Sequence, residues 1–283
     1  MANRLDSAQV RQYRDQGFLL IDEPVFPAEK FAAFKERFEM HLHVWQEQMG
    51  EPVEIIDRAH FVDPRLNDWL LAPEVLDLVE PLIGPDIALF ASSCLNKLDT
   101  VGKRVPWHED GSYWKSMAQN RIEVATVWLA IDPSTTENGC MRVIPGSHRE
   151  RDRVHEEVDD GSDVLLTQTV RRDLFDESTA IDCVLEPNHC SLHDAYLIHG
   201  SNATNGKTRR CSYQMRYMPT TVKSSTAGGQ QIYLARGVDH AGNDYADPTS
   251  VNERWLQDDP KLQRIADRCA AFVSPRPSRG LLP

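Results

Sequence analysis

The sequence predicts a mainly β protein with flanking helices, in which an antiparallel sandwich or barrel forms the core. From about residue 87 the chain breaks into short runs of β-type composition that are separated by turn residues. No long helical pattern lies between these runs, whereas an α/β fold needs one after each strand. The chain also lacks an internal repeat and a low-complexity linker. We therefore expect a single domain, 1–283, with a helical N-terminal part (about 1–85), a β core (about 86–220) and a C-terminal extension (about 221–283).

The chain is expected to open with a short helix followed by a strand. Asp6 is a suitable N-cap, Gln9 follows three residues later as in a capping box, and Gly17 is a natural helix stop. The apolar run 18–21 then indicates a buried strand.

Two further helices are predicted before the β core and one after it. Between Pro27 and Gly50, large apolar residues recur at spacings of three and four and share one helix face, which we interpret as packing surface: Phe31, Phe34, Phe38, Leu42 and Trp45. Pro73 and Gly84 bracket a shorter helix, with proline at its start and glycine at its end. Residues 255–272 indicate a closing helix, and we expect the tail behind it to be loose.

Seven runs in the β core have the composition of strands. They are 88–98, 123–132, 140–144, 164–170, 181–185, 190–193 and 209–220. Many short strands without interleaved helices are typical of a sandwich or a closed barrel.

Charge and cysteine usage narrow the class of protein. The net charge of −12 argues against broad attraction to nucleic acid or to an anionic membrane, while a local basic pocket for a small anion remains compatible with it. The N-terminus has no signal-peptide core, and no apolar run is long enough to span a bilayer. The six cysteines contain no C-x-x-C pair, so we expect reduced thiols and a cytoplasmic protein.

The segment around His108-Glu109-Asp110 is the most informative for chemistry. In an extended chain, residues two apart point to the same side, so His108 and Asp110 can converge on one metal while Glu109 points away. His199 is the best third ligand, and His193 is its competitor. Two imidazoles and one carboxylate on one face of a metal form the arrangement of non-haem Fe(II) oxygenases.

A second pattern lies eleven positions after His199. Strand alternation over 209–220 places Arg210, Ser212, Gln214 and Arg216 on one face. Two arginines on a buried strand face are costly unless they line a wet, functional cavity, and a guanidinium suits bidentate capture of a carboxylate. The alternative is a solvated outer face.

Several segments, in consistent order over about residues 7–220, together resemble the phytanoyl-CoA dioxygenase family. They are Tyr13-Arg14-Asp15-Gln16-Gly17-Phe18, His108-Glu109-Asp110, Glu137-Asn138-Gly139-Cys140, Ile144-Pro145-Gly146-Ser147-His148, and His199-Gly200-Ser201-Asn202 followed by Arg210. The resemblance implies a double-stranded β-helix (a jelly-roll, cupin-like barrel), Fe(II), 2-oxoglutarate and O₂, with ascorbate as a possible reductant. It also implies release of succinate and CO₂, coupled to oxidation of a substrate C–H bond.

The resemblance assigns roles to individual residues. It implies that His108, Asp110 and His199 hold iron and that Arg210 meets the distal carboxylate of 2-oxoglutarate. Further cosubstrate positions match Ser201, Trp128, Lys97 and Ser93. Some relatives are halogenases with a small residue in place of the acidic ligand; because Asp110 is present, we expect hydroxylation or a related oxidation.

Two rival functions use the same residues. One is a jelly-roll binding protein without redox catalysis, and the other is a zinc-dependent hydrolase or isomerase with the same triad. The expected partner is a small organic molecule whose identity the sequence does not reveal. Tyr113, Trp114 and Arg142 are the residues we expect at the border of its cavity.

Overall fold

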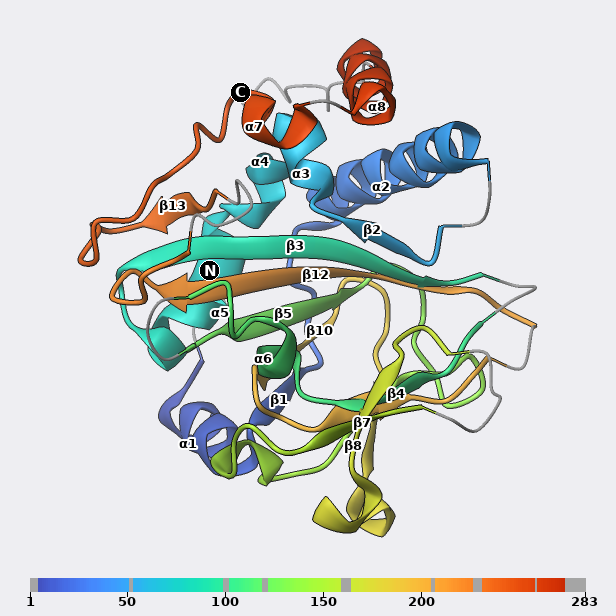
Figure 1. Ribbon diagram of the computed structural model, residues 1–283, viewed down its shortest axis with the longest axis vertical. Coiled ribbons are helices and arrows are strands. Elements are labelled where there is room, and N and C mark those ends of the chain that lie inside the picture. Colours follow the sequence, from blue (N-terminus) through green and yellow to red (C-terminus); the bar gives the residue numbers. More distant parts are fainter. Residues whose placement is uncertain are drawn as a thin grey trace, which may run out of the picture.

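The computed structural model describes residues 5–50, 53–98, 102–118, 122–158, 164–204, 207–225, 231–257 and 259–272. Within these ranges the protein is mainly antiparallel β-sheet with helices packed against it (Figure 1). No helix in these ranges is long and apolar enough to cross a membrane. The expected loose tail lies outside the described residues.

A seven-stranded antiparallel sheet forms the centre of the molecule. Its strands follow the order β1-β10-β5-β12-β3-β13, and β2 pairs with β3 beside β13. The bounds are β1 (Phe18–Ile21), β2 (Ile55–Asp57), β3 (Ile87–Lys97), β5 (Ala125–Ala130), β10 (Cys190–Asp194), β12 (Arg210–Pro219) and β13 (Tyr233–Arg236). Because β12 is paired along both edges, by β3 and by β5, its side chains have fixed positions.

A smaller antiparallel sheet lies against one face of the large one (Figure 1). Its order is β4 (Val105–His108), β11 (His199–Ser201), β6 (Met141–Val143) and β9 (Ile181–Cys183), and a hairpin of β7 (His155–Glu157) and β8 (Gln168–Val170) lies beside it. Trp128 of β5 and Met141 of β6 belong to one buried apolar cluster, so the two sheets pack face to face.

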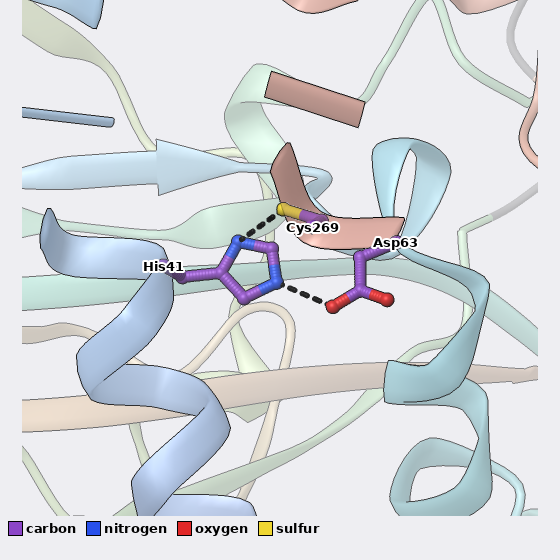
Figure 2. Close-up of side chains that lie close together, drawn as sticks. All are labelled: His41, Asp63 and Cys269. Atoms are coloured by element: carbon purple, nitrogen blue, oxygen red, sulfur yellow. Dashed lines mark hydrogen bonds and ion pairs between the residues drawn. The ribbon is translucent and has the colours of Figure 1, made fainter. Parts of the chain in front are cut away.

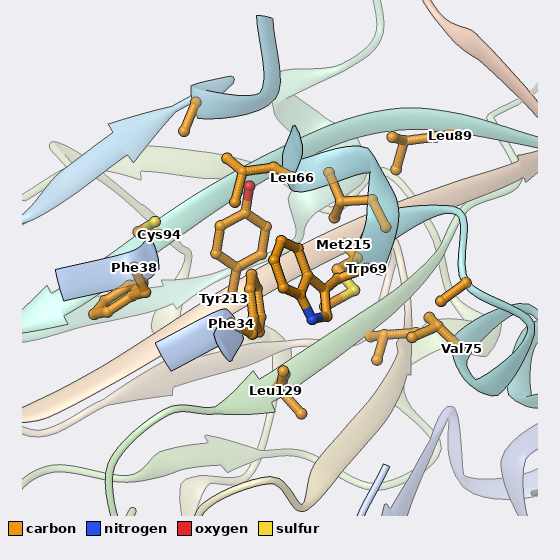
Figure 3. Close-up of a cluster of buried hydrophobic side chains, with 14 of the residues drawn as sticks. Phe34, Phe38, Leu66, Trp69, Val75, Leu89, Cys94, Leu129, Tyr213 and Met215 are labelled. Atoms are coloured by element: carbon orange, nitrogen blue, oxygen red, sulfur yellow. The ribbon is translucent and has the colours of Figure 1, made fainter. Parts of the chain in front are cut away.

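Helices cover the opposite face of the large sheet. They are α2 (Ala28–Met49), α3 (Ala59–Val62), η1 (Pro64–Leu66), α4 (Asn67–Leu70) and α5 (Pro73–Ile83), with α7 (Glu253–Leu256) and α8 (Pro260–Ala271) packed outside them. Helix α1 (Ser7–Gln16) lies beside β1, at the lower left in Figure 1. The expected apolar face of α2 provides the packing: the ring of Phe34 lies 5.1 Å from that of Tyr213 on β12 and 5.2 Å from that of Trp69 (Figure 3). Three short 3-10 helices lie in the loops: η2 (Ser147–Arg149), η3 (Arg172–Leu174) and η4 (Glu177–Thr179).

The local capping features explain where the helices begin and end. Asp6 and Gln9 form the expected capping box, and Gly17 adopts the left-handed conformation (φ 80°) at the end of α1. The expected closing helix over 255–272 is instead two helices, because Asp259 caps a new helix at Pro260.

A buried polar cluster attaches α8 to α2. His41 Nε2 lies 2.7 Å from Asp63 Oδ2, and Cys269 Sγ lies 3.9 Å from His41 Nδ1 (Figure 2). Arg37 donates two hydrogen bonds to Asp63, at 2.6 and 2.7 Å, so both carboxylate oxygens are engaged. The Arg37 guanidinium therefore already binds both oxygens of the Asp63 carboxylate, which a metal would need as a ligand. The ion pair thus joins α2 to the turn between α3 and η1, and α8 is attached to it through the Cys269 carbonyl, which accepts from Arg37 at 2.9 Å.

Each of the seven expected β runs contains a strand. The strands without a clear sequence pattern are β2, β4, β7, β11 and β13, all three or four residues long. Such short segments contain too few residues to display a period of two.

Candidate metal and cosubstrate site

Three predicted ligands converge in the space between the two sheets. His108 ends β4, Asp110 begins the short helix α6 (Asp110–Tyr113), and His199 begins β11 directly opposite His108. Their ligand atoms all lie within 4.8 Å of one another. Asp110 Oδ1 is 3.5 Å from His108 Nε2 and 3.9 Å from His199 Nε2. As the expected alternation requires, Glu109 is extended and points away while His108 and Asp110 converge, and α6 begins at Asp110.

The histidines are oriented as metal ligands. His108 Nδ1 lies 2.8 Å from the carbonyl of Pro106, and His199 Nδ1 lies 2.9 Å from that of Leu197. A ring nitrogen that donates to a carbonyl leaves the other nitrogen, here Nε2, as a lone-pair donor. The residues present therefore fit a divalent metal bound by two imidazoles and one carboxylate.

Electrostatics favour the ligand forms of these side chains. Burial raises the pKa of Asp110, but hydrogen bonding with His108 and His193 and the charge of Arg216 outweigh it and hold this pKa well below its usual range. Burial, reinforced by the neighbouring His108, keeps the pKa of His199 well below its usual value. The carboxyl is thus ionised and the His199 imidazole neutral, as metal binding requires.

The two competing ligands lie elsewhere. Glu109 is fully buried and points away, with its carboxylate 2.7 Å from Arg153 Nη1. His193, on β10, lies behind the carboxylate, with Nε2 3.8 Å from Asp110 Oδ2, and is not part of the three-ligand group.

Arg210 lies at one end of the cavity, and the amine-bearing Lys97 is buried next to it. They face each other across β12 and β3, and each is 1% exposed. Within the described part of the chain, no ion pair joins either of them to a carboxylate. Burial lowers the pKa of Arg210 to about 10, and burial together with Arg210 lowers the pKa of Lys97 to about 6. At pH 7 the Lys97 amine is therefore mostly neutral, and Arg210 is the buried cation suited to an anionic ligand. The solvated outer face considered for this strand is excluded.

Ser201 and Trp128 complete this end of the site. The Ser201 hydroxyl is buried and has no hydrogen-bond partner among the described residues. The guanidinium of Arg210 lies over the Trp128 ring at 5.3 Å, so the indole fixes its orientation. Both residues line the same cavity as the three metal ligands.

Gly139, from the Glu137-Asn138-Gly139 turn, packs against this end. Its φ is +75°, and a Cβ there would lie 2.8 Å from Lys97 Nζ and 2.5 Å from the carbonyl oxygen of Asn202, to which Lys97 donates. The turn therefore needs glycine both for its conformation and for the space occupied by the lysine.

Ser93 does not lie beside Arg210, where a cosubstrate residue is expected. It is opposite Gln214 in the β3–β12 register, and its hydroxyl contacts Gln214 and Arg216 at 3.2 and 2.8 Å. Ser93 therefore belongs to the opposite end of the cavity from Lys97.

The cavity has a volume of about 290 Å³, and its remaining wall is mostly apolar. The expected Tyr113 and Trp114 line it, together with Ile55, Met117 and Leu166. Arg142 does not; it stacks on Trp107 in a neighbouring groove and pairs with Glu177 and Asp182. Ile55 and Leu166 come from segments remote in sequence, whereas Met117 follows Trp114 by three residues.

Comparison with known proteins assigns the chain to a family. A sequence profile described as phytanoyl-CoA dioxygenase matches residues 13–211. The chain is 24% identical over 221 residues to a probable alpha-ketoglutarate-dependent hypophosphite dioxygenase of Stutzerimonas stutzeri, covering 71% of this chain and 74% of that protein. It is 27% identical over 229 residues to the peroxisomal phytanoyl-CoA dioxygenase of Mus musculus, covering 72% of this chain and 66% of that enzyme.

Solved structures with a similar fold cover most of the chain. The non-heme monooxygenase ThoJ in its apo form superposes with a TM-score of 0.69 at 22% identity, over 93% of this chain and 99% of that one. EvdO2 from Micromonospora carbonacea var. aurantiaca, complexed with 2-oxoglutarate, gives a TM-score of 0.63 at 19% identity, over 77% of this chain and 93% of that one. The profile match over most of the sequence shows that the chain belongs to the phytanoyl-CoA dioxygenase family, and it is therefore an oxidoreductase of the dioxygenase type.

Proposed function

We propose that this protein is an Fe(II)- and 2-oxoglutarate-dependent oxygenase that oxidises a C–H bond of a small organic molecule. The observation that carries the proposal is the convergence of His108, Asp110 and His199 on one point, with their ligand atoms within 4.8 Å of one another at the wall of a cavity. Three ligands on one face of a metal leave positions open for a cosubstrate and O₂. When bound, iron supplies the activation of O₂, and 2-oxoglutarate leaves as succinate and CO₂ while one oxygen atom enters the substrate.

The protein's own residues bind and orient the cosubstrate in this proposal. Arg210 meets the distal carboxylate with parallel N–H donors, and Trp128 beneath it holds the guanidinium in place. Ser201 donates its unpartnered hydroxyl to the same ligand. A carboxylate at Arg210 supplies a counter-ion and so favours protonation of the neighbouring Lys97, whose pKa is lowered by burial and by Arg210.

The arrangement of the sheets supports a double-stranded β-helix. The two antiparallel sheets pack face to face and place the site between them, with the two histidines on the smaller sheet, Asp110 at the start of α6, and Arg210 on the larger sheet. The similarity in fold to non-heme oxygenases supports the same architecture.

The cavity favours a small substrate. Its volume of about 290 Å³ lies at the lower end of the range for small-molecule sites, and the cosubstrate occupies part of it. The names of the relatives span hypophosphite and phytanoyl-CoA, so family membership leaves the substrate open.

The rival functions fit the site less well. Family membership argues against a binding protein without catalysis. A zinc hydrolase gives no reason for Arg210, a cation buried without a carboxylate partner among the described residues.

The test is anaerobic addition of Fe(II) and 2-oxoglutarate to the metal-free protein. We expect a weak visible charge-transfer band that saturates at one equivalent of iron, and its loss in His108→Ala and in His199→Ala with the fold retained. The matched control is His193→Ala, which should keep the band. Loss in His193→Ala with retention in His199→Ala would move the third ligand to His193, and no band in the wild type would refute the proposed function.

A further inference from the structure

The cavity contains a second arginine that the proposed cosubstrate does not use. Arg216 lies on β12 six residues after Arg210, beyond the metal ligands, and its side chain is 12% exposed. The guanidinium lies over the ring of Trp114 at 5.4 Å, so the indole supports one of its faces.

Arg216 is held by neutral acceptors. Nη1 donates to Ser93 Oγ at 2.8 Å, and Nη2 donates to Gln214 Oε1. Its carboxylate neighbour is Asp110, 3.7 Å from Nε, which is too long for a hydrogen bond, and that carboxylate is already committed to the metal site. A guanidinium has five N–H donors, so three remain for a ligand, including the buried Nε.

The charge balance of the cavity also indicates an anion. Its described lining contains three arginines (Arg58, Arg210, Arg216) and two carboxylates (Asp57, Asp110), a net charge of +1 in a protein whose overall charge is −12. Arg58 and Asp57 pair with each other. A divalent iron and the 2-oxoglutarate dianion cancel each other, so the excess positive charge persists when both are bound.

We propose that the substrate carries an anionic oxygen group, a carboxylate or a phosphonate, which is bound by Arg216 with Ser93 and Gln214 holding the guanidinium in place. This inference rests on the proposed function and names the substrate class of the same site. The apolar residues Tyr113, Met117 and Leu166 then accommodate the uncharged part of a small acid.

The experiment compares matched acids and amides. Acetate, propionate and methylphosphonate are titrated against acetamide and propionamide into the anaerobic enzyme·Fe(II)·2-oxoglutarate complex, in chloride-free buffer because chloride competes for a guanidinium. Binding is followed by the shift of the charge-transfer band and by calorimetry, so the readout does not depend on turnover. For the wild type, we expect at least one acid to bind about tenfold or more tightly than the amides.

Variants at Arg216 test whether this residue causes the preference for acids over amides. Arg216→Gln is expected to weaken that acid about tenfold or more and to remove the preference, while the 2-oxoglutarate titration changes less than about threefold. Arg216→Lys should restore part of the affinity, and Ser93→Ala should give a smaller loss in the same direction. The matched control, Arg142→Gln, changes an arginine in the neighbouring groove and should keep the full preference.

Two sets of outcomes separate the inference from the proposed function. Equal binding of acids and amides, no binding of any acid, or an acid preference that survives Arg216→Gln would overturn the inference while the iron and 2-oxoglutarate titrations stay normal. Failure of the wild type to bind iron or 2-oxoglutarate would overturn the proposed function itself.

Discussion

The Nδ1 atoms of His108 and His199 are each held by a backbone carbonyl of the same chain segment. Each Nδ1 hydrogen-bonds to the carbonyl two residues earlier, at 2.8 and 2.9 Å. This local interaction selects the tautomer with Nε2 free, independently of any metal. At the residue scale, the site is therefore already arranged for a ligand.

Arg210→Ala is expected to weaken 2-oxoglutarate without removing iron. Loss of one partner of a buried charge pair costs about 2–5 kcal/mol, so the dissociation constant should rise by roughly 30-fold or more. Arg210→Lys should restore part of the affinity, because a point charge cannot reproduce the planar fork. The measurement is a 2-oxoglutarate titration of the charge-transfer band at saturating Fe(II).

The neighbouring Arg209 is a matched control, because it points out of the cavity and pairs with Glu39 and Asp132. Arg209→Ala should leave the titration unchanged. A normal titration in Arg210→Ala with a collapsed one in Arg216→Ala would place the cosubstrate at Arg216 instead.

Asp110→Gly is expected to reduce substrate oxidation to near background. The substitution removes the anionic ligand and opens a coordination position, even if some iron stays bound to the imidazoles. Succinate and product are measured together, once a substrate is found. The control is Glu109→Gln: this carboxylate pairs with Arg153 and faces away, so iron binding should persist. Undiminished oxidation in Asp110→Gly would refute the role of this carboxylate.

Strand pairing determines where the ligands meet. β11 places His199 opposite His108 of β4, and this pairing requires close approach of the two backbones at Gly200. A Cβ on Gly200 would lie 2.8 Å from the carbonyl oxygen of Val105 and 3.3 Å from that of Pro106. At the scale of elements, the glycine between His199 and Ser201 therefore sets the separation of the two imidazoles.

Gly200→Ala should accordingly impair both stability and metal binding. Overpacking of this kind costs about 1–3 kcal/mol, and the shift of β11 moves His199 relative to His108. Urea unfolding and an Fe(II) titration measure the two effects. An unchanged midpoint together with an unchanged iron affinity would show that the backbones are not closely packed at this point.

At the scale of the whole molecule, a buried ion pair joins α2 to the turn between α3 and η1, and its Arg37 also donates to the Cys269 carbonyl of α8. Asp63→Asn leaves the Arg37 charge without its carboxylate, and breaking a buried pair in this way costs about 3–5 kcal/mol. Urea unfolding at pH 7 measures the loss. The control His43→Ala changes an exposed histidine on the same helix and should have little effect.

The same carboxylate predicts a pH dependence. Burial raises the pKa of Asp63, but the hydrogen bonds from His41 and Arg37 outweigh it, so the net shift is downward. A lowered folded-state pKa contributes stability above the unfolded value of about 3.9, and this stability is lost as the pH falls further. The difference in unfolding free energy between wild type and Asp63→Asn should therefore shrink below about pH 4. A constant difference down to pH 3 would contradict this.

Short-range sequence patterns alone predicted many of the helices, strands and site residues of this protein. The capping box at Asp6, the apolar face of α2 and the cores of seven strands depend on neighbours within a few residues, so the sequence reveals them. The order of motifs likewise identified the family and the residues proposed for iron and 2-oxoglutarate, because each motif is a short segment with its own chemistry.

Long-range contacts decided the rest. The short strands β2, β4, β7, β11 and β13 exist because partner strands complete them, and His199 meets His108 only through the pairing of β11 with β4. The β3–β12 register decides that Ser93 lies near Arg216 and that Lys97 lies opposite Arg210. The cavity wall takes Ile55 and Leu166 from segments that lie far from the metal ligands in the sequence. Burial and pairing across the sheets are properties of the folded chain, since side chains distant in sequence become neighbours only when the two sheets close on each other.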